Sequence, residues 1–255
     1  MQTGKRVLIT AGGSGIGLAI ARAFAAEEAK VHICDINEDA LRVVTKADPS
    51  ITSSVCDVSD RSAVERMVKA ATTELGGLDV LVNNAGISGP TAPVEEMDPD
   101  AWEAVLRVNL TGTFNVTRLS IPYLRKSRSG VIIIMSSIGG RFGYPNRSPY
   151  ATTKWGLIGL TKTLSIELGE EGIRVNTILP GPVEGPRLQH VFEGRAKATG
   201  KSLAEVTKEQ LANQSLKRFV DPKDIAALAL FLASDNAGSI SGQMLPIDGD
   251  SQAAE

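Results

Sequence analysis

A tyrosine and a lysine four residues apart are the first pair in this sequence whose side chains are suited to chemistry. Tyr150 and Lys154 open a segment with helical spacing of apolar residues, so both project from one helical face. A phenol with a pKa near ~10 is a poor base at neutral pH, and a nearby ammonium lowers that pKa because it favours the phenolate. The pair predicts proton transfer with a small substrate, although the same spacing also fits a solvated surface pair.

A glycine-rich turn near the start of the chain is suited to holding a phosphate. Residues Thr10 to Gly17, TAGGSGIG, follow a strand-like run and precede an alanine-rich helical segment. Glycines allow close approach of a diphosphate, and a helix amino terminus presents free N–H groups. The spacing departs from the common GxGxxG pattern, and such turns also serve as plain corners. The strand before and the helix after favour phosphate binding.

An aspartate ends the next strand-like run, 18 residues beyond the last glycine of the turn, Gly17. A carboxylate at the position of Asp35 accepts hydrogen bonds from an adenosine ribose and repels a 2′-phosphate. Positions 14 and 36 are occupied by Ser14 and Ile36, and neither is a basic residue that would attract that phosphate. The sequence therefore favours NAD(H) over NADP(H), against the alternative of an ordinary strand-end aspartate.

The elements that must position these residues alternate along the chain between short apolar runs and longer segments of helical periodicity. The predicted strands are residues 6–10, 30–34, 51–56, 78–83, 131–135, 174–179 and 243–247. The predicted helices are residues 15–28, 38–46, 61–75, 100–124, 150–168 and 223–232. This alternation predicts an α/β fold, a Rossmann-type doubly wound parallel sheet of about seven strands with helices on both faces.

Residues 180–216 form the one long segment predicted to be irregular, with a weakly helical middle over 194–211. A long loop in a compact domain is usually a functional lid or disordered, and this one follows the carboxyl end of a strand. We therefore expect a substrate lid over residues 182–216. Since no linker or repeat interrupts the pattern, residues 1–255 are expected to form a single domain.

The composition and charge of the 255 residues exclude several classes of protein. With 42% hydrophobic and 22% charged residues, the chain has the balance of a globular protein with a large core. The 27 basic and 29 acidic residues give a net charge of −2, which predicts no nucleic-acid or anionic-membrane partner. The longest apolar run, 226–233, is too short to span a membrane, and the chain start resembles no signal peptide, so a cytoplasmic location is expected.

Cysteine and histidine are too few to suggest a disulfide framework or a metal centre. Cys34 and Cys56 lie at the ends of strand-like runs and are predicted to be buried free thiols. The chain has two histidines, His32 and His190, and neither a CxxC nor an HExxH pattern. No metal is expected in the site.

Several motifs considered together resemble one family. They are Thr10 to Gly17, Asn83-Asn84-Ala85-Gly86, Asn109, Ser137, Tyr150-Ala151-Thr152-Thr153-Lys154 and Pro180-Gly181. In this order and at these spacings they resemble the short-chain dehydrogenase/reductase family over essentially the whole chain. The resemblance implies hydride transfer between a nicotinamide cofactor and a secondary alcohol or ketone. It also implies a homotetramer in which the segments 100–124 and 150–168 pair between subunits.

The resemblance also implies roles for individual residues. Tyr150 would be the general acid/base, and Lys154 would lower the tyrosine's pKa and hold the nicotinamide ribose. Ser137, rather than Ser136, lies at the family's distance from the tyrosine and would donate to the substrate oxygen. Asn109 would hold a water in the proton relay toward Lys154, or it could simply kink its helix and bind backbone groups.

For the cofactor, the resemblance assigns Asn84 to Gly86 to the adenosine side, Asp57 and Val58 to the adenine, and Pro180 and Val183 to the nicotinamide. The full predicted set is Gly12, Ser14, Gly15, Ile16, Gly17, Asp35, Ile36, Asp57, Val58, Asn84, Ala85, Gly86, Tyr150, Lys154, Pro180, Gly181 and Val183.

The expected substrate pocket is mixed in character. Its residues are Ser88, Gly139, Arg141, Phe142, Tyr144, Asn146, Glu184, Arg187, Leu188 and Phe192. The polar and charged members suggest an acidic or polar substrate such as a hydroxy acid or a sugar derivative, against the alternative of solvated lid side chains.

Three positions depart from the family's pattern. Ala11 replaces the first glycine, which is acceptable if its φ is negative. Gly185 stands where a threonine is common, and Asp250 stands where a second glycine is common.

Two other functions stay open. The first is 3-oxoacyl-[acyl-carrier-protein] reduction, which commonly uses NADPH and is therefore disfavoured by Asp35. The second is a non-catalytic nucleotide sensor, which has no need to keep Ser137, Tyr150 and Lys154 together.

Overall fold

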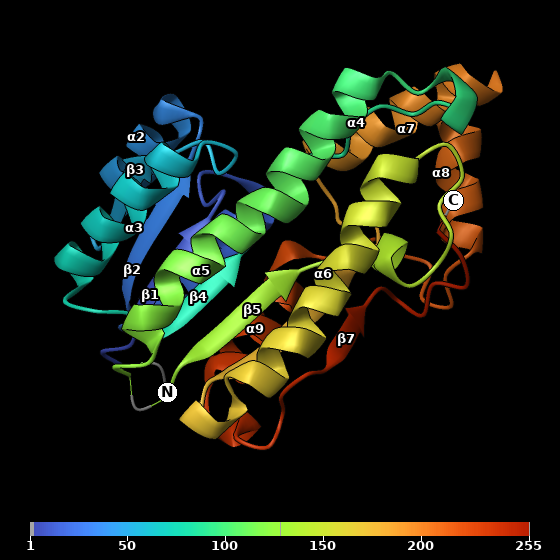
Figure 1. Ribbon diagram of the computed structural model, residues 1–255. Coiled ribbons are helices and arrows are strands. Elements are labelled where there is room, and N and C mark those ends of the chain that lie inside the picture. Colours follow the sequence, from blue (N-terminus) through green and yellow to red (C-terminus); the bar gives the residue numbers. More distant parts are fainter. Residues whose placement is uncertain (1–2, 128, 255) are drawn as a thin grey trace.

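A computed structural model describes residues 3–127 and 129–254, and in this part of the chain seven parallel strands form one sheet (Figure 1). The strands are β1 (Arg6–Thr10), β2 (Lys30–Asp35), β3 (Ile51–Val55), β4 (Val80–Asn83), β5 (Val131–Met135), β6 (Arg174–Pro180) and β7 (Met244–Ile247). Their order is β3-β2-β1-β4-β5-β6-β7. The predicted doubly wound α/β fold is confirmed.

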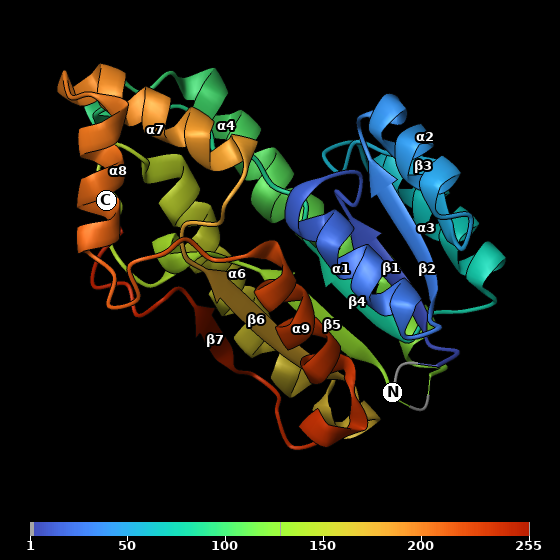
Figure 2. The ribbon, with the colours of Figure 1, turned by 180° about the vertical axis from the view of Figure 1, so that it is seen from behind.

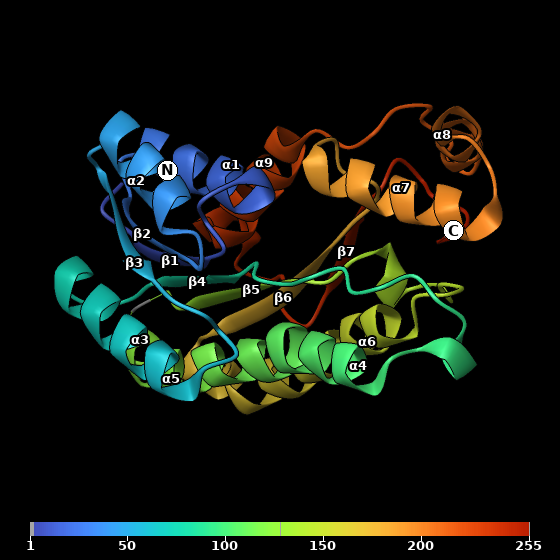
Figure 3. The same ribbon diagram turned by 90° about the horizontal axis from the view of Figure 1, so that it is seen from above.

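Helices cover both faces of the sheet, as the view from above shows (Figure 3). They are α1 (Gly15–Ala26), α2 (Glu38–Ala47), α3 (Arg61–Leu75), α4 (Pro99–Leu106), α5 (Thr113–Leu124), α6 (Ser148–Glu167), α7 (Pro186–Thr199), α8 (Leu203–Ala212) and α9 (Pro222–Ala233). The helices α3, α5 and α6 pack on one face, and α1, α2 and α9 pack on the other (Figure 2). Among the described residues, no helix is both long and apolar enough to cross a membrane.

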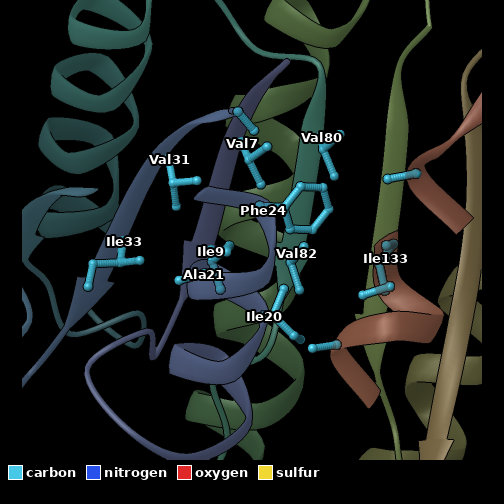
Figure 4. Packing of buried hydrophobic residues seen from close by; sticks show 14 of the residues in the cluster. Val7, Ile9, Ile20, Ala21, Phe24, Val31, Ile33, Val80, Val82 and Ile133 are labelled. Atoms are coloured by element: carbon cyan, nitrogen blue, oxygen red, sulfur yellow. The ribbon is translucent and has the colours of Figure 1, made fainter. Parts of the chain in front are cut away.

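Each face of the sheet has its own hydrophobic core, because successive strand residues point to opposite sides. On one side Phe24 and Ile20 of α1 pack against Ile9 and Val82 (Figure 4). On the other side the core includes Leu8 and Leu81 with side chains from α3, α5 and α6. Burying each such large side chain contributes about 1.5–3 kcal/mol, so the sheet is a rigid support for the loops at its ends. Cys34 and Cys56 are buried free thiols, as predicted.

The strand order reverses at β1, which pairs with β2 on one side and β4 on the other. Chain segments leaving the carboxyl ends of β1 and β4 diverge to opposite faces, and ligands of open α/β sheets bind in the crevice that this creates. The glycine-rich turn after β1 and the Asn84 segment after β4 both lie at this crevice.

The prediction of one uninterrupted helix over residues 100–124 is wrong. The helix α4 ends at Leu106, a π-helical segment occupies Arg107–Gly112, and α5 follows. A π turn accommodates an extra residue without breaking the helix, so the apolar periodicity persists across it. Here the turn carries Asn109, whose side chain bonds to the backbone of Ile87.

The prediction that 180–216 is mostly irregular, with helical character centred on 194–211, is also wrong. Two helices, α7 and α8, occupy most of the segment. Pro186 starts α7, Gly200 ends it in the left-handed conformation, and Ser202 forms a capping box with Glu205 at the start of α8. The predicted helical middle thus spans the break between two real helices.

The condition under which an alanine would be acceptable at position 11, a negative φ, is not met, because the φ of Ala11 is +51°. The side-chain amide of Asn84 donates to the carbonyl oxygen of Ala11 at 3.1 Å, which helps to hold this turn. A Cβ in the left-handed region costs about 1–2 kcal/mol, so the turn after β1 is strained at this residue.

Replacing Ala11 with glycine is therefore expected to raise the free energy of unfolding by about 0.5–1 kcal/mol, since the relieved strain exceeds the added backbone entropy of the unfolded chain. Urea unfolding measures the change. Ala92→Gly is the matched control, because Ala92 has no positive φ, and this variant should lose stability. Equal losses in both variants would contradict the strain at Ala11.

Candidate active site

A cavity of about 570 Å³ lies at the carboxyl ends of the strands. Residues predicted for the cofactor that line it are Ser14, Gly15, Ile16, Asp35, Ile36, Asp57, Val58, Asn84, Ala85, Gly86, Tyr150, Lys154, Pro180, Gly181 and Val183. Ser137 lines it too, as do the predicted substrate residues Ser88, Tyr144, Glu184, Arg187, Leu188 and Phe192. The structure thus brings the glycine-rich turn and the tyrosine–lysine pair to one cavity.

Some predicted residues do not line this cavity. They are Gly12, Gly17, Asn109, Gly139, Arg141, Phe142 and Asn146. Arg141 is exposed and lies 3.9 Å from the Asp248 carboxylate. Gly139 packs under the tyrosines, since a Cβ there would lie 3.1 Å from the Tyr144 ring and 3.3 Å from the Tyr150 ring.

The glycine-rich turn leaves the amino terminus of α1 open toward the cavity. Ser14 caps α1 with extended backbone, and within this described helix its side chain makes no capping hydrogen bond and the first turn carries no acid. Gly15 has a φ of +53°, and a Cβ at Gly17 would lie 2.1 Å from the Ala11 carbonyl oxygen. Free N–H groups at a helix amino terminus suit a diphosphate.

Hydrogen bonds join the ends of β1 and β4. The Thr10 hydroxyl accepts from the backbone N–H groups of Asn84 at 3.0 Å and of Ala85 at 2.9 Å. The Asn84 amide donates to the carbonyl oxygens of Thr10 and Ala11, both at 3.1 Å. These bonds fix the crevice where the two chain segments diverge.

Asp35 ends β2 and faces the glycine turn. Its carboxylate accepts from the backbone N–H of Gly13 at 3.1 Å and of Asn37 at 3.0 Å. The basic residues that line the cavity in the described part of the chain, Arg147, Lys154 and Arg187, come from segments beyond β5. The Asp35 end of the cavity is therefore acidic.

Lys154 is buried, with 4% of its surface exposed, on the inner face of α6. Its ammonium donates to the carbonyl oxygen of Met135 at 2.8 Å and lies 5.5 Å from the centre of the Tyr150 ring. Burial lowers the pKa of Lys154 to about 8, although the Tyr150 phenol partly opposes this effect. The lysine is thus a desolvated cation placed against a phenol.

Tyr150 has a pKa below its ordinary value. Burial alone raises the pKa of the phenol, but the charges of Lys154 and Arg187 and a hydrogen bond with Ser137 outweigh burial and lower it. The Ser137 hydroxyl also accepts from the backbone N–H of Gly139 at 3.1 Å. A phenol of lowered pKa beside a hydroxyl donor is equipped for proton exchange with a substrate oxygen.

Asn109 is fully buried in the π turn. Its side chain forms hydrogen bonds with backbone groups, which was one of the two alternatives given for it from the sequence. Its Oδ1 accepts from the N–H of Ile87 at 2.8 Å, and its Nδ2 donates to the Ile87 carbonyl oxygen at 3.0 Å and to Thr153 at 3.2 Å. Gly86 lies beside both Asn109 and the lysine, since a Cβ at Gly86 would lie 3.2 Å from Asn109 Oδ1 and 3.6 Å from Lys154 Nζ.

Among the cavity residues that the sequence did not single out, Arg147 and Gln210 are buried and polar. Arg147 is 2% exposed, and its guanidinium carbon lies 5.3 Å from the ring centres of both Tyr144 and Tyr150. Gln210 on α8 is 3% exposed. The short distance along the chain from Arg147 to Tyr150 is a signal that could have found it, whereas nothing in the sequence marks Gln210.

Comparison with known proteins places this architecture among oxidoreductases. A family model described as enoyl-(acyl carrier protein) reductase matches residues 10–249. The chain is 39% identical to the 3-oxoacyl-[acyl-carrier-protein] reductase FabG of Thermotoga maritima, over 96% of this chain and 97% of that protein.

Two solved structures are closely similar. The first, NAD⁺-bound xylitol dehydrogenase, has a TM-score of 0.93 and 32% identity, and the match covers 97% of this chain and 98% of that one. The second, a variant of actinorhodin polyketide ketoreductase with NADPH, has a TM-score of 0.93 and 32% identity, covering 98% and 97%. The chain belongs to the short-chain dehydrogenase/reductase family and is an oxidoreductase that interconverts alcohols and ketones.

Proposed function

We propose that this protein is an NAD(H)-dependent dehydrogenase of secondary alcohols in which Tyr150 is the general acid/base. The observation that carries the proposal is the buried Lys154 ammonium, 5.5 Å from the Tyr150 ring, in the same cavity as the glycine-rich turn. Such a pair lowers the pKa of the phenol, which favours its use as an acid/base in proton transfer.

The cavity fits a nicotinamide dinucleotide. The open amino terminus of α1 suits the diphosphate, and the acidic Asp35 suits the adenosine ribose. Asp57, Val58 and the segment 84–86 would hold the adenosine, and Pro180, Gly181 and Val183 would flank the nicotinamide. When bound, the dinucleotide supplies hydride transfer to or from the substrate carbon.

The residues of the chain divide the remaining work. In alcohol oxidation the Tyr150 phenolate accepts the hydroxyl proton, and Ser137 donates a hydrogen bond to the substrate oxygen. Lys154 keeps the phenol acidic and holds the nicotinamide ribose. Asn109, buried behind Gly86, acts through the backbone of Ile87 and a relay toward Lys154. In ketone reduction each proton moves the opposite way.

The preference for NAD(H) rests on this chain's own residues, because the two similar structures hold NAD⁺ in one case and NADPH in the other. The carboxylate of Asp35 repels a 2′-phosphate, and the neighbouring Ile36 offers no positive charge.

The leading alternative is reduction of a 3-oxoacyl group on acyl carrier protein, favoured by the 39% identity to the FabG reductase. A non-catalytic nucleotide sensor would have no use for Ser137, Tyr150 and Lys154 in one cavity. The dehydrogenase interpretation accounts for both the proton-transfer residues and the acidic ribose end.

The assembly and the segment over the cavity belong to the same proposal. Phe114 on α5 and Trp155 and Ile166 on α6 are large exposed apolar side chains, which supports a homotetramer paired through these helices.

Residues 182–216, with α7 and α8, contribute Glu184, Leu188 and Gln210 to the cavity, which supports their role as a substrate lid. A cytoplasmic location stays a prediction.

Replacing Tyr150 with phenylalanine tests the proposed function. Because the variant lacks the proton acceptor, kcat for a secondary alcohol should fall about 10²- to 10⁴-fold, whereas the Kd for NADH from fluorescence titration should barely change. Tyr123→Phe is the matched control, since Tyr123 lies on α5 outside the cavity. Full activity of Tyr150→Phe would refute the assigned role.

The pH profile tests the influence of Lys154 on the phenol. Alcohol oxidation needs the phenolate, so kcat/KM should rise with pH to a midpoint below the ordinary tyrosine pKa of ~10. In Lys154→Met the midpoint should move upward, because the favourable charge is gone, while Lys154→Arg should keep it low. An unmoved midpoint in Lys154→Met would count against the electrostatic coupling.

Cofactor preference is tested with Asp35→Asn, which keeps an oxygen acceptor but removes the charge. The ratio of kcat/KM for NAD⁺ to that for NADP⁺ should fall at least about tenfold, because repulsion of the 2′-phosphate is lost. Asp39→Asn on α2, outside the cavity, is the control and should leave the ratio unchanged. A wild-type enzyme that uses both cofactors equally well would defeat the NAD(H) assignment.

A further inference from the structure

Two buried nitrogen donors lack an acceptor on the wall of the active-site cavity. Arg147 Nε and Gln210 Nε2 have no hydrogen-bond partner among residues 3–127 and 129–254. Both residues line the cavity that contains Ser137 and Tyr150. A buried polar group without a partner costs about 1–3 kcal/mol, so such groups are expected to meet a ligand.

One other polar atom of each residue already has a hydrogen-bond partner. The Arg147 Nη2 group donates to the carbonyl oxygen of Ser88 at 2.7 Å, and the Gln210 Oε1 atom accepts from Arg195 at 3.0 Å. These bonds fix both side chains, and the faces of the Tyr144 and Tyr150 rings flank the Arg147 guanidinium. The free donors therefore have fixed positions.

The buried guanidinium of Arg147 has no carboxylate counter-ion in the described part of the chain. Arg147, Arg187 and Arg195 form no ion pair with any described carboxylate. Glu184 and Arg187 also line the cavity, but both are exposed, and Glu184 forms an ion pair with none of the three arginines. A buried guanidinium is normally paired, so the missing partner is expected to be an anion.

We propose that Arg147 and Gln210 form a subsite for a substrate carboxylate, so that the enzyme acts on short hydroxy acids and the corresponding oxo acids. The carboxylate accepts from Arg147 Nε and Gln210 Nε2 and supplies the missing negative charge. Because Arg147 lies against the Tyr150 ring, the hydroxyl-bearing carbon is only a few bonds away. This inference rests on the proposed function and adds a substrate class to it.

The carboxylate takes no part in proton or hydride transfer, so the two residues determine specificity only. An acyl chain carried on a protein thioester lacks the anionic oxygen pair that this subsite accepts. A neutral alcohol would leave both donors unpartnered, and a site in which a donor is unpaired discriminates strongly against such a ligand.

The first test compares matched substrates on the wild-type enzyme with NAD⁺. The 2-, 3- and 4-hydroxy acids of four and five carbons are assayed beside their primary amides and methyl esters. At least one acid should exceed its amide by about 30-fold or more in kcat/KM. Equal efficiency for every acid and its amide would overturn the subsite while leaving the dehydrogenase assignment intact.

The second test uses variants and follows the acid-to-amide ratio, which cancels any effect of Arg147 on the Tyr150 phenol. Arg147→Gln should abolish the preference, mainly through a higher KM for the acid, and Arg147→Lys should restore part of it. Gln210→Leu should reduce it less. Arg141→Gln, an exposed arginine outside the cavity, is the matched control, and an unchanged ratio in both arginine-to-glutamine variants would overturn the proposal.

A binding measurement separates this inference from the proposed function. Calorimetry of the wild-type NADH complex with butyrate and with butyramide should detect binding of butyrate only. If no alcohol is oxidised, the proposed function fails, but selective butyrate binding that is lost in Arg147→Gln and partly kept in Arg147→Lys would still support the subsite. Failure of butyrate to bind more tightly than butyramide would overturn it.

Discussion

The desolvated ammonium of Lys154 is the constraint on which the rest of the site depends. Moving a lysine out of water disfavours its charged form, which is why burial lowers its pKa to about 8. The Met135 carbonyl oxygen at the end of β5 accepts one of its protons, and the adjacent phenol of Tyr150 offers a potential negative charge. The lysine and the tyrosine therefore stabilise each other's charged forms, and both need the fixed geometry of β5 and α6.

The sheet supplies that geometry and also the opposite end of the cavity. The reversal of strand order at β1 opens a crevice, and the hydrogen bonds between Thr10 and the segment after β4 fix its shape. Ala11 adopts a left-handed conformation in this turn even though a glycine would do so with less strain. The strain lies at the glycine-rich end of the cavity, and local backbone strain is often found at functional sites.

Much of the fold could be predicted because buried parallel strands are continuous apolar runs, such as the run Val131 to Met135, and because amphipathic helices have a clear period. The π turn at Asn109 escaped prediction, since one extra residue leaves the periodicity almost intact. The break at Gly200 escaped because the charges and glycines of that segment look irregular although each helix is well capped. The sign of φ at Ala11 depends on tertiary hydrogen bonds that no local rule encodes.

Only part of the candidate site could be predicted from the sequence. The motif spacings predicted that Ser137, Tyr150, Lys154 and Asp35 belong to one site, and the structure places all four in the lining of one cavity. The roles of these residues stay predictions. Arg147 and Gln210 were missed because each is notable for a buried nitrogen donor that has no hydrogen-bond partner, and the structure is needed to find such a donor. Arg141 and Asn146, which look equally polar in sequence, lie outside the cavity lining.

The most direct test of the central claim is a pH titration of the tyrosine ring carbons by ¹³C NMR in the free enzyme. The chain has three tyrosines, so the signal of Tyr150 is identified by its disappearance in Tyr150→Phe. The account predicts that this signal titrates below the ordinary tyrosine pKa of ~10, whereas burial raises the pKa of the neighbouring Tyr144. A Tyr150 signal that titrates at or above ~10 would contradict the proposal that Lys154 makes the phenol a competent acid/base.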